Sequence, residues 1–193
     1  MDVYYDFEFL ENGRTIEPIS LGIVTGNGAE YYAVVKDAPW GLIYRHEWLM
    51  ANVVPHLPQI PGWLTARVNL GHDICKPKSQ IALEVQYFLT VNRDDEDTKL
   101  YGWYSAYDHV CLAQLWGRMI DLPNCIPMYT RDLKQDYDRL RVTGVLVDND
   151  VKPEQDSGEH HALVDARWNR TMHDWLLKKE HGISETPKVV NAK

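Results

Sequence analysis

The sequence has few cysteines and no long apolar run. Its three cysteines, Cys75, Cys111 and Cys125, are odd in number and include no Cys-x-x-Cys pair. A chain of 193 residues can bury a core without disulfides, so we expect three reduced core thiols rather than a disulfide framework. No apolar stretch approaches the roughly 18 residues that a membrane span needs, and the strand-like N-terminus does not resemble a signal peptide. We therefore expect a cytoplasmic protein with no membrane partner.

Several catalytic signatures are also missing. There is no glycine-rich loop that could cradle a phosphate and no Gly-x-Ser-x-Gly turn around a nucleophilic serine. Histidines and cysteines do not show the spacing of a tetrahedral zinc site. Asp148-Asn149-Asp150 could begin a calcium loop, but Lys152 and Pro153 stand where such a loop has a ligand and a turn. These absences exclude the common nucleotide-triphosphate, serine-hydrolase, zinc and EF-hand sites.

The sequence has fewer basic than acidic residues. The chain has 28 acidic and 20 basic residues, a formal net charge of -8. Proteins that grip long duplexes by releasing counterions need a basic face, so we do not expect that mode of binding. A short nucleic-acid end is the better expectation, because acids gathered around divalent cations would account for part of the negative charge.

The apolar patterning indicates one α/β domain, residues 1–179, followed by a frayed tail over 180–193. Strands are expected at 3–10, 18–25 and 30–35, with turns between them, and again at 100–104 and 126–129. Helices are expected at 43–54, around 81–89, from 108 towards Pro123, at 130–142 and at 162–179. This order predicts a mixed five-stranded sheet with helices on both faces.

Four carboxylates stand at positions where chemistry is possible. Asp6 and Glu8 are two residues apart in the first strand, which puts both on one face about 7 Å apart. Asp108 and Asp165 each open a helix in line with its apolar stripe. The alternative for Asp6 and Glu8 is that they are solvated acids on the strand surface. The alternative for the two helix acids is that they only complement the helix dipole. A buried carboxylate is costly unless it is paired, however. Since two separate helices each place an acid on their core-facing stripe, the pattern indicates a metal site.

Histidines lie beside the last of these acids. His160 and His161 precede the final helix, and either could accept a proton from a metal-bound water near neutral pH. Two exposed histidines without a role are the alternative, and periodicity does not choose between the two positions. Asp132 is expected only to favour its helix N-terminus, and the seven tryptophans are expected in the core rather than in base-stacking platforms.

Together these residues resemble a known family. Asp6-Phe7-Glu8, Tyr107-Asp108 and the run from His160 to Asp165 are similar to the three motifs of the DEDD 3′–5′ exonucleases, in the branch with a histidine five residues before the last aspartate. That spacing of five residues identifies His160, and not His161, as the histidine of the motif. The resemblance implies a ribonuclease-H-like fold.

The resemblance also implies a mechanism and a substrate. Two Mg²⁺ or Mn²⁺ ions would be held by Asp6, Glu8, Asp108 and Asp165, with Asp6 bridging them and His160 as general base. Nucleoside 5′-monophosphates would be released from single-stranded 3′ ends, with RNA favoured over DNA, and the chain would form a homodimer. Phe9 and Leu10, just past the first motif, are candidates to contact the terminal base. A non-catalytic binding protein on the same fold is the alternative.

Overall fold

In the part of the chain that the structure describes, six strands form one mixed sheet. The computed structural model describes residues 1–62, 65–93, 97–155 and 159–183. The strands lie in the order β4-β3-β2-β1-β5-β6, and only β2 is antiparallel to its neighbours. The expected α/β class with a mixed sheet is confirmed, but the expected number of five strands is wrong. The additional strand, β4, is too short for sequence alternation to reveal. The bounds are β1 Asp2–Glu11, β2 Ile16–Thr25, β3 Glu30–Val35, β4 Cys75–Lys76, β5 Lys99–Gly102 and β6 Arg131–Asp132.

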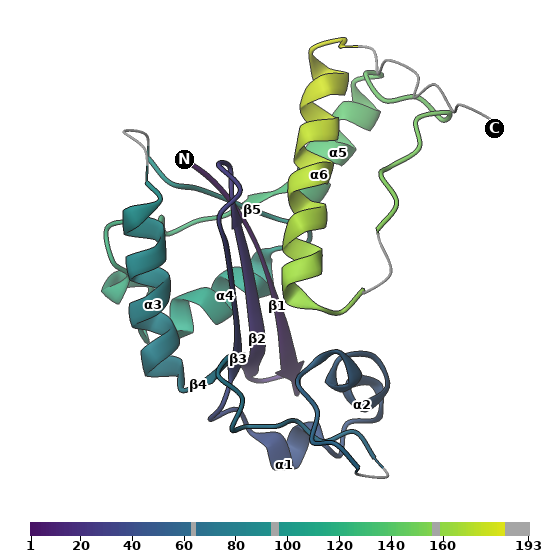
Figure 1. The fold of residues 1–193 in the computed structure, drawn as a ribbon. Helices are drawn as coiled ribbons and strands as arrows, with labels where there is room; N and C mark the ends of the chain where they lie inside the picture. The colour runs from purple at the N-terminus through teal and green to yellow at the C-terminus, as the bar shows by residue number, and fades with distance from the viewer. Residues whose placement is uncertain (63–64, 94–96, 156–158, 184–193) are drawn as a thin grey trace, which may run out of the picture.

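Helices cover both faces of this sheet, as expected (Figure 1). Alternate β1 residues such as Val3 and Tyr5 pack with α3 and α4 in the larger core, whereas Tyr4 packs with α5 and α6 in the smaller one. The long helix α6 lies across β1 and β2. The bounds are α1 Trp40–Ile43, α2 Glu47–Asn52, α3 Lys78–Val91, α4 Ala106–Gln114, α5 Leu133–Val142 and α6 Ala162–Glu180.

Three sequence expectations about local structure are wrong. The helix expected at 43–54 is two short helices, because the Nδ1 of His46 accepts a bond from the backbone N–H of Leu49 and starts α2 anew. The helix α4 ends at Gln114 and not near Pro123, and Gly117 follows it with a φ of 103°. The strand expected at 126–129 lies instead at Arg131–Asp132, where it pairs with β5.

The strand β1 is longer than its neighbour β5. Only Asp2 to Tyr4 pair with β5, so the second half of β1 has no strand on that side among the described residues. Two side chains satisfy its backbone instead. The Oδ1 of Asp108 accepts a hydrogen bond from the N–H of Phe7 at 3.0 Å, and the Nδ2 of Asn169 donates to the carbonyl of Tyr5 at 3.0 Å. The helices α4 and α6 are thereby joined to β1 beyond the end of β5.

A glycine on β2 lets α6 approach the sheet. Gly22 pairs with Asp6 in the β1–β2 ladder. A Cβ atom at Gly22 would lie 2.3 Å from the carbonyl oxygen of Ala162 and 2.3 Å from the nitrogen of Leu163, both backbone atoms of the first turn of α6. Only glycine permits this contact, and the contact brings the N-terminus of α6 over the carboxylates of β1.

The remaining expectations concern the state of the cysteines, the absence of a membrane-spanning helix and the C-terminal tail. All three cysteines are buried and free, which confirms the expected core thiols. In the ranges that the structure describes, no helix is both long and apolar enough to cross a membrane. Of the tail expected at 180–193, residues 184–193 lie outside the described residues.

Candidate active site

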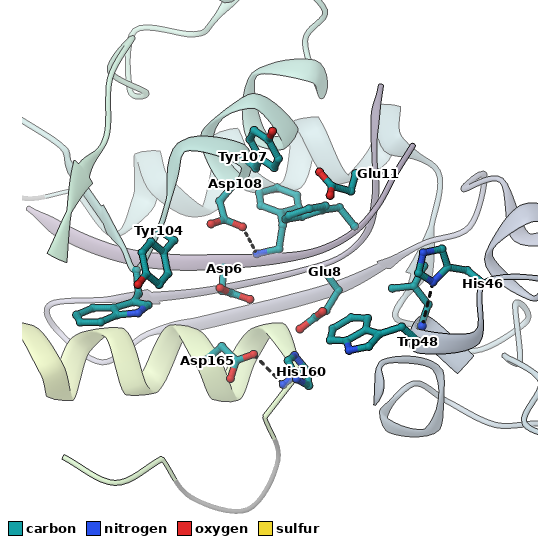
Figure 2. A pocket seen from close by; sticks show the side chains of 14 residues that line it. Asp6, Glu8, Glu11, His46, Trp48, Tyr104, Tyr107, Asp108, His160 and Asp165 are labelled. Carbon is teal, nitrogen blue, oxygen red and sulfur yellow. Dashed lines mark hydrogen bonds between the residues drawn. The ribbon is translucent and has the colours of Figure 1, made fainter. Parts of the chain in front are cut away.

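Three carboxylates converge beside the middle of β1. One ligand oxygen from each of Asp6, Glu8 and Asp165 lies within 4.8 Å of the others. The strand period of two brings Asp6 and Glu8 to the face that α6 covers, and the first turn of α6 supplies Asp165. The side chain of Glu8 is buried and those of Asp6 and Asp165 are half-buried. Figure 2 shows the three carboxylates pointing toward one another.

Asp108 approaches from the opposite side of β1. It lies in the first turn of α4, is 5% exposed and lines the same cavity as the three clustered acids. Because its Oδ1 already accepts the bond from Phe7, its Oδ2 is the oxygen left for a ligand. The four acids that the sequence singled out therefore border one cavity, although Asp108 lies outside the tight group of three.

Burial and mutual repulsion favour protonated carboxyls in this cluster. Burial, and then the charges of Asp165 and Asp108, raise the pKa of Glu8 to about 9. Burial, followed by the charges of Asp108 and Glu8, holds the pKa of Asp6 well above its usual range. Burial also raises the pKa of Asp108 to about 7 and that of Asp165 to about 6, although hydrogen bonds from backbone N–H groups oppose both shifts.

No lysine or arginine among the described residues forms an ion pair with these four acids. Oxygen donors that are crowded, partly buried and without a cationic partner fit hard divalent cations such as Mg²⁺ and Mn²⁺. The residues present therefore suit the metal ions that the resemblance implies.

The two candidate histidines have different surroundings. His160 lines the cavity, and its ring meets Trp48 edge-on with centroids 4.8 Å apart. Its backbone has a φ of 68°, and its N–H donates to the Oδ2 of Asp165 at 3.1 Å. His161 instead stacks on Tyr32 with centroids 4.5 Å apart and is not among the residues lining the cavity. The geometry thus distinguishes two positions that periodicity could not.

Gln155 is a site residue that sequence reasoning missed. Its Nε2 donates a short hydrogen bond to the Oδ1 of Asp165, so both oxygens of that carboxylate are held. The segment that carries Gln155 is tied to α6, because the indole N–H of Trp168 donates to the carbonyl of Pro153 at 3.1 Å. No motif marks this glutamine, since its loop has no periodicity.

The cavity around the acids has a volume of about 530 Å³ and an aromatic rim. This volume is in the range of small-ligand sites. The expectation that tryptophans belong to the core is wrong for Trp48, which is 48% exposed at the rim, because α2 turns its side chain to the cavity and not to the sheet. The place of Tyr107 at this cavity could have been predicted from the sequence, because Tyr107 directly precedes Asp108. The rim side chains are Phe9, Trp48, Trp103, Tyr104 and Tyr107 (Figure 2).

The two candidate base contacts are separated by the structure. Phe9 lines the cavity and meets Tyr107 edge-on with centroids 5.9 Å apart. Leu10 is buried in the larger core and does not line the cavity, so the geometry gives no support to its expected contact with a base. A change of register in the β1–β2 ladder between Glu8 and Phe9 interrupts the regular alternation at this point.

Known proteins share this chain's sequence over most of its length. The family model described as the 3′-5′ exoribonuclease Rv2179c-like domain matches residues 1–177. The proteins named 3′-5′ exoribonuclease Rv2179c and 3′-5′ exoribonuclease MT2234.1, from two strains of Mycobacterium tuberculosis, are each 36% identical over 167 residues, which cover 86% of this chain and 88% of the relative. A solved structure of S. pombe Pop2p in a Mg²⁺- and Mn²⁺-bound form matches with a TM-score of 0.49 and 12% identity, covering 96% of this chain and 86% of that one. The chain belongs to the Rv2179c-like 3′-5′ exoribonuclease domain family.

Proposed function

We propose that this protein is a metal-dependent 3′–5′ exoribonuclease that releases nucleoside 5′-monophosphates from the 3′ end of single-stranded RNA. One observation carries the proposal: oxygens of Asp6, Glu8 and Asp165 lie within 4.8 Å of one another in a cavity that Asp108 and His160 also line. Membership of the family supports the same activity.

The metal ligands follow from the donor set. We infer that Asp6, Glu8, Asp108 and Asp165 would hold two Mg²⁺ or Mn²⁺ ions. When bound, such a pair activates water and stabilises the departing oxygen of an in-line phosphoryl displacement. The chain's own contribution is to present hard oxygen donors from β1, α4 and α6 without competing cationic side chains.

His160 is our candidate for the general base. Its ring lines the cavity, while the bond from its N–H to Asp165 fixes its backbone beside the carboxylates. Water attacks the scissile phosphorus, the P–O bond to the 3′ oxygen of the preceding nucleotide breaks, and the imidazole of His160 takes up the proton of the water. That proton can then pass to the departing oxygen or to solvent.

The aromatic rim suits an unstacked RNA end. Bases of a single strand can stack on aromatic side chains regardless of their identity. We propose Phe9 as a contact of the terminal nucleotide, because its ring lines the cavity and packs edge-on against Tyr107. The acidic net charge fits such short contacts better than an extended basic groove.

The deciding experiment is digestion of a 5′-labelled single-stranded RNA with Mg²⁺ or Mn²⁺. We expect a ladder that shortens from the 3′ end, release of nucleoside 5′-monophosphates, and no ladder with EDTA or with the isosteric variant Asp6→Asn. A DNA strand of the same sequence, digested in parallel, measures the sugar preference. Intact RNA under all metal conditions would contradict the proposal, and a ladder that persists in Asp6→Asn would contradict the assigned site.

Two further properties remain predictions. The resemblance predicts a homodimer, and light scattering that finds one chain per particle at micromolar concentration would contradict it. The sequence also predicts a cytoplasmic location, which fractionation of the source cells would test.

A further inference from the structure

Two residues with strained backbones line the same cavity. Among the residues that the structure describes, Tyr104 and His160 are the non-glycine residues with positive φ, at 57° and 68°. A bulky residue in this region is rare and costs free energy, and such residues cluster at functional sites. Both side chains line the cavity that contains the carboxylates. His160 already has a proposed role there, whereas Tyr104 has none.

The strained backbone of Tyr104 is held by an aspartate, as that of His160 is. The Oδ1 of Asp132 accepts a hydrogen bond from the N–H of Tyr104 at 3.1 Å and another from the N–H of Lys134 at 2.9 Å. Since the second bond caps α5, the turn at Tyr104 is joined to a helix. For His160 the corresponding acceptor is the Oδ2 of Asp165. In both places a carboxylate stabilises a conformation that turns a ring towards the cavity.

The ring of Tyr104 has no evident structural role. Its side chain is 63% exposed, and its aromatic contact is an edge-on one with Trp103, whose ring centroid is 5.7 Å away. Core packing therefore does not explain the unfavourable backbone. An exposed aromatic face beside a catalytic cavity is suited to stacking with a nucleobase.

We propose that Tyr104 is a substrate-positioning residue that stacks on the base of the nucleotide on the 5′ side of the scissile phosphate. This inference rests on the proposed exoribonuclease function. Figure 2 shows Tyr104 on one side of Asp6 and His160 on the other. In an in-line displacement the attacking and departing oxygens lie on opposite sides of the phosphorus. If water enters from the side of His160, the departing 3′ oxygen and its nucleotide lie towards Tyr104.

The first test separates stacking from folding. Asn accepts positive φ more readily than Tyr, so Tyr104→Asn removes the ring and relieves strain, whereas Tyr104→Phe keeps the ring. For release of the first nucleotide from a short RNA, we expect Tyr104→Asn to raise KM on the order of tenfold. Its melting temperature should not fall, and Tyr104→Phe should stay near wild type. An unchanged KM in Tyr104→Asn would overturn the proposal.

The second test identifies the base. RNA oligonucleotides with one abasic residue, either last or second to last, are compared in wild type and in Tyr104→Asn. We expect the second-to-last abasic residue to raise the wild-type KM about as much as the substitution does, and to add nothing in Tyr104→Asn. A penalty confined to the last position, or an equal penalty in both proteins, would overturn the assignment.

The same experiments keep the two proposals apart. A wild-type protein that digests RNA and loses activity in Asp6→Asn supports the exoribonuclease function whatever Tyr104 does. If wild-type and Tyr104→Asn proteins then have the same KM, only the inference about Tyr104 fails. If the wild-type protein leaves RNA intact, the proposed function itself fails.

Discussion

Individual carboxyls of the site bind protons more tightly than free carboxyls do. The pKa values of Asp165, Asp108 and Glu8 are raised to about 6, 7 and 9, in each case chiefly by burial. A divalent cation needs these groups ionised, so binding must displace protons as pH falls below these values. At the scale of the residue, protons and the proposed metal ions should therefore compete for the same carboxylates.

That competition predicts that metal affinity rises with pH. In calorimetric titrations with Mn²⁺ we expect the Kd to fall steadily from pH 6 to pH 9, with protons released on binding. The number of protons released is obtained by comparing buffers with different heats of ionisation. Glu8→Gln, which keeps the shape but has no acidic proton, should release fewer protons. An affinity that is constant over this range would contradict the expectation.

Gln155 should orient Asp165 for the metal. Its Nε2 donates to the Oδ1 of Asp165, and hydrogen bonds of this kind around metal ligands commonly contribute 10- to 100-fold in affinity. We expect Gln155→Ala to weaken Mn²⁺ binding about tenfold with little change in melting temperature. Gln80→Ala is the matched control, because Gln80 bonds Glu84 on the surface of α3, away from the cavity. Equal Mn²⁺ affinities in the two variants would remove Gln155 from the site.

The relative placement of whole elements depends on small contacts. The first turn of α6 can lie close to β2 only because Gly22 has no side chain. That contact sets the position of Asp165 relative to Asp6 and Glu8, which lie on the neighbouring strand. At the scale of the element, the proposed metal site depends on the packing of one helix end on one strand.

Gly22→Ala should therefore separate the carboxylates. The new Cβ would meet backbone atoms of α6 at 2.3 Å, which no side-chain rotation can relieve. We expect a loss of roughly 1–3 kcal/mol in the free energy of unfolding, together with much weaker Mn²⁺ binding. Gly26→Ala is the control, since its nearest atom would be at an ordinary 3.5 Å. Denaturant unfolding and calorimetry measure the two effects, and wild-type Mn²⁺ binding in Gly22→Ala would refute the expectation.

The elements with strong periodicity are the ones that the sequence predicts well. The first three strands and α6 lie within two residues of their expected ends. The misplaced elements are short: β6 has two residues and is defined by its pairing with β5, which no local pattern reports. The four acids could likewise be predicted from their spacing and Phe9 from its place beside the first motif, whereas Gln155 and the other rim aromatics were not predicted. The role of Gln155, for example, arises from a contact between its irregular loop and Asp165 of α6, which no periodic pattern reports.

The stability of the whole molecule should also depend on the site. A carboxyl whose pKa is raised on folding contributes stability that is present below its unfolded pKa and is lost as pH rises through the folded pKa. For Glu8 that window extends from about 4.5 to about 9. In the metal-free protein, ionising these acids at high pH must therefore favour unfolding, and bound cations must oppose it.

We expect Glu8→Gln to become more stable than metal-free wild type as pH rises from 5 to 9. Glutamine removes the ionisation while keeping the buried shape, so the difference between the two proteins isolates this one group from the buried histidines. Thermal unfolding in EDTA measures the difference, and added Mg²⁺ should reverse it by stabilising the wild type more. A difference in melting temperature that is independent of pH would contradict the argument.

The carboxylates of the site come from distant parts of the chain. Asp6 and Glu8 lie near its beginning, whereas Asp165 enters with the first turn of α6, the last helix among the described residues. During synthesis on the ribosome, the early strands can pair while the chain still has only part of its metal site. Because Asp165 lies in α6, the cluster of three carboxylates is complete only when α6 has docked against Gly22. A chain whose early strands have paired but whose α6 has not yet docked therefore carries only two of the three clustered carboxylates, and we expect it to bind Mn²⁺ weakly.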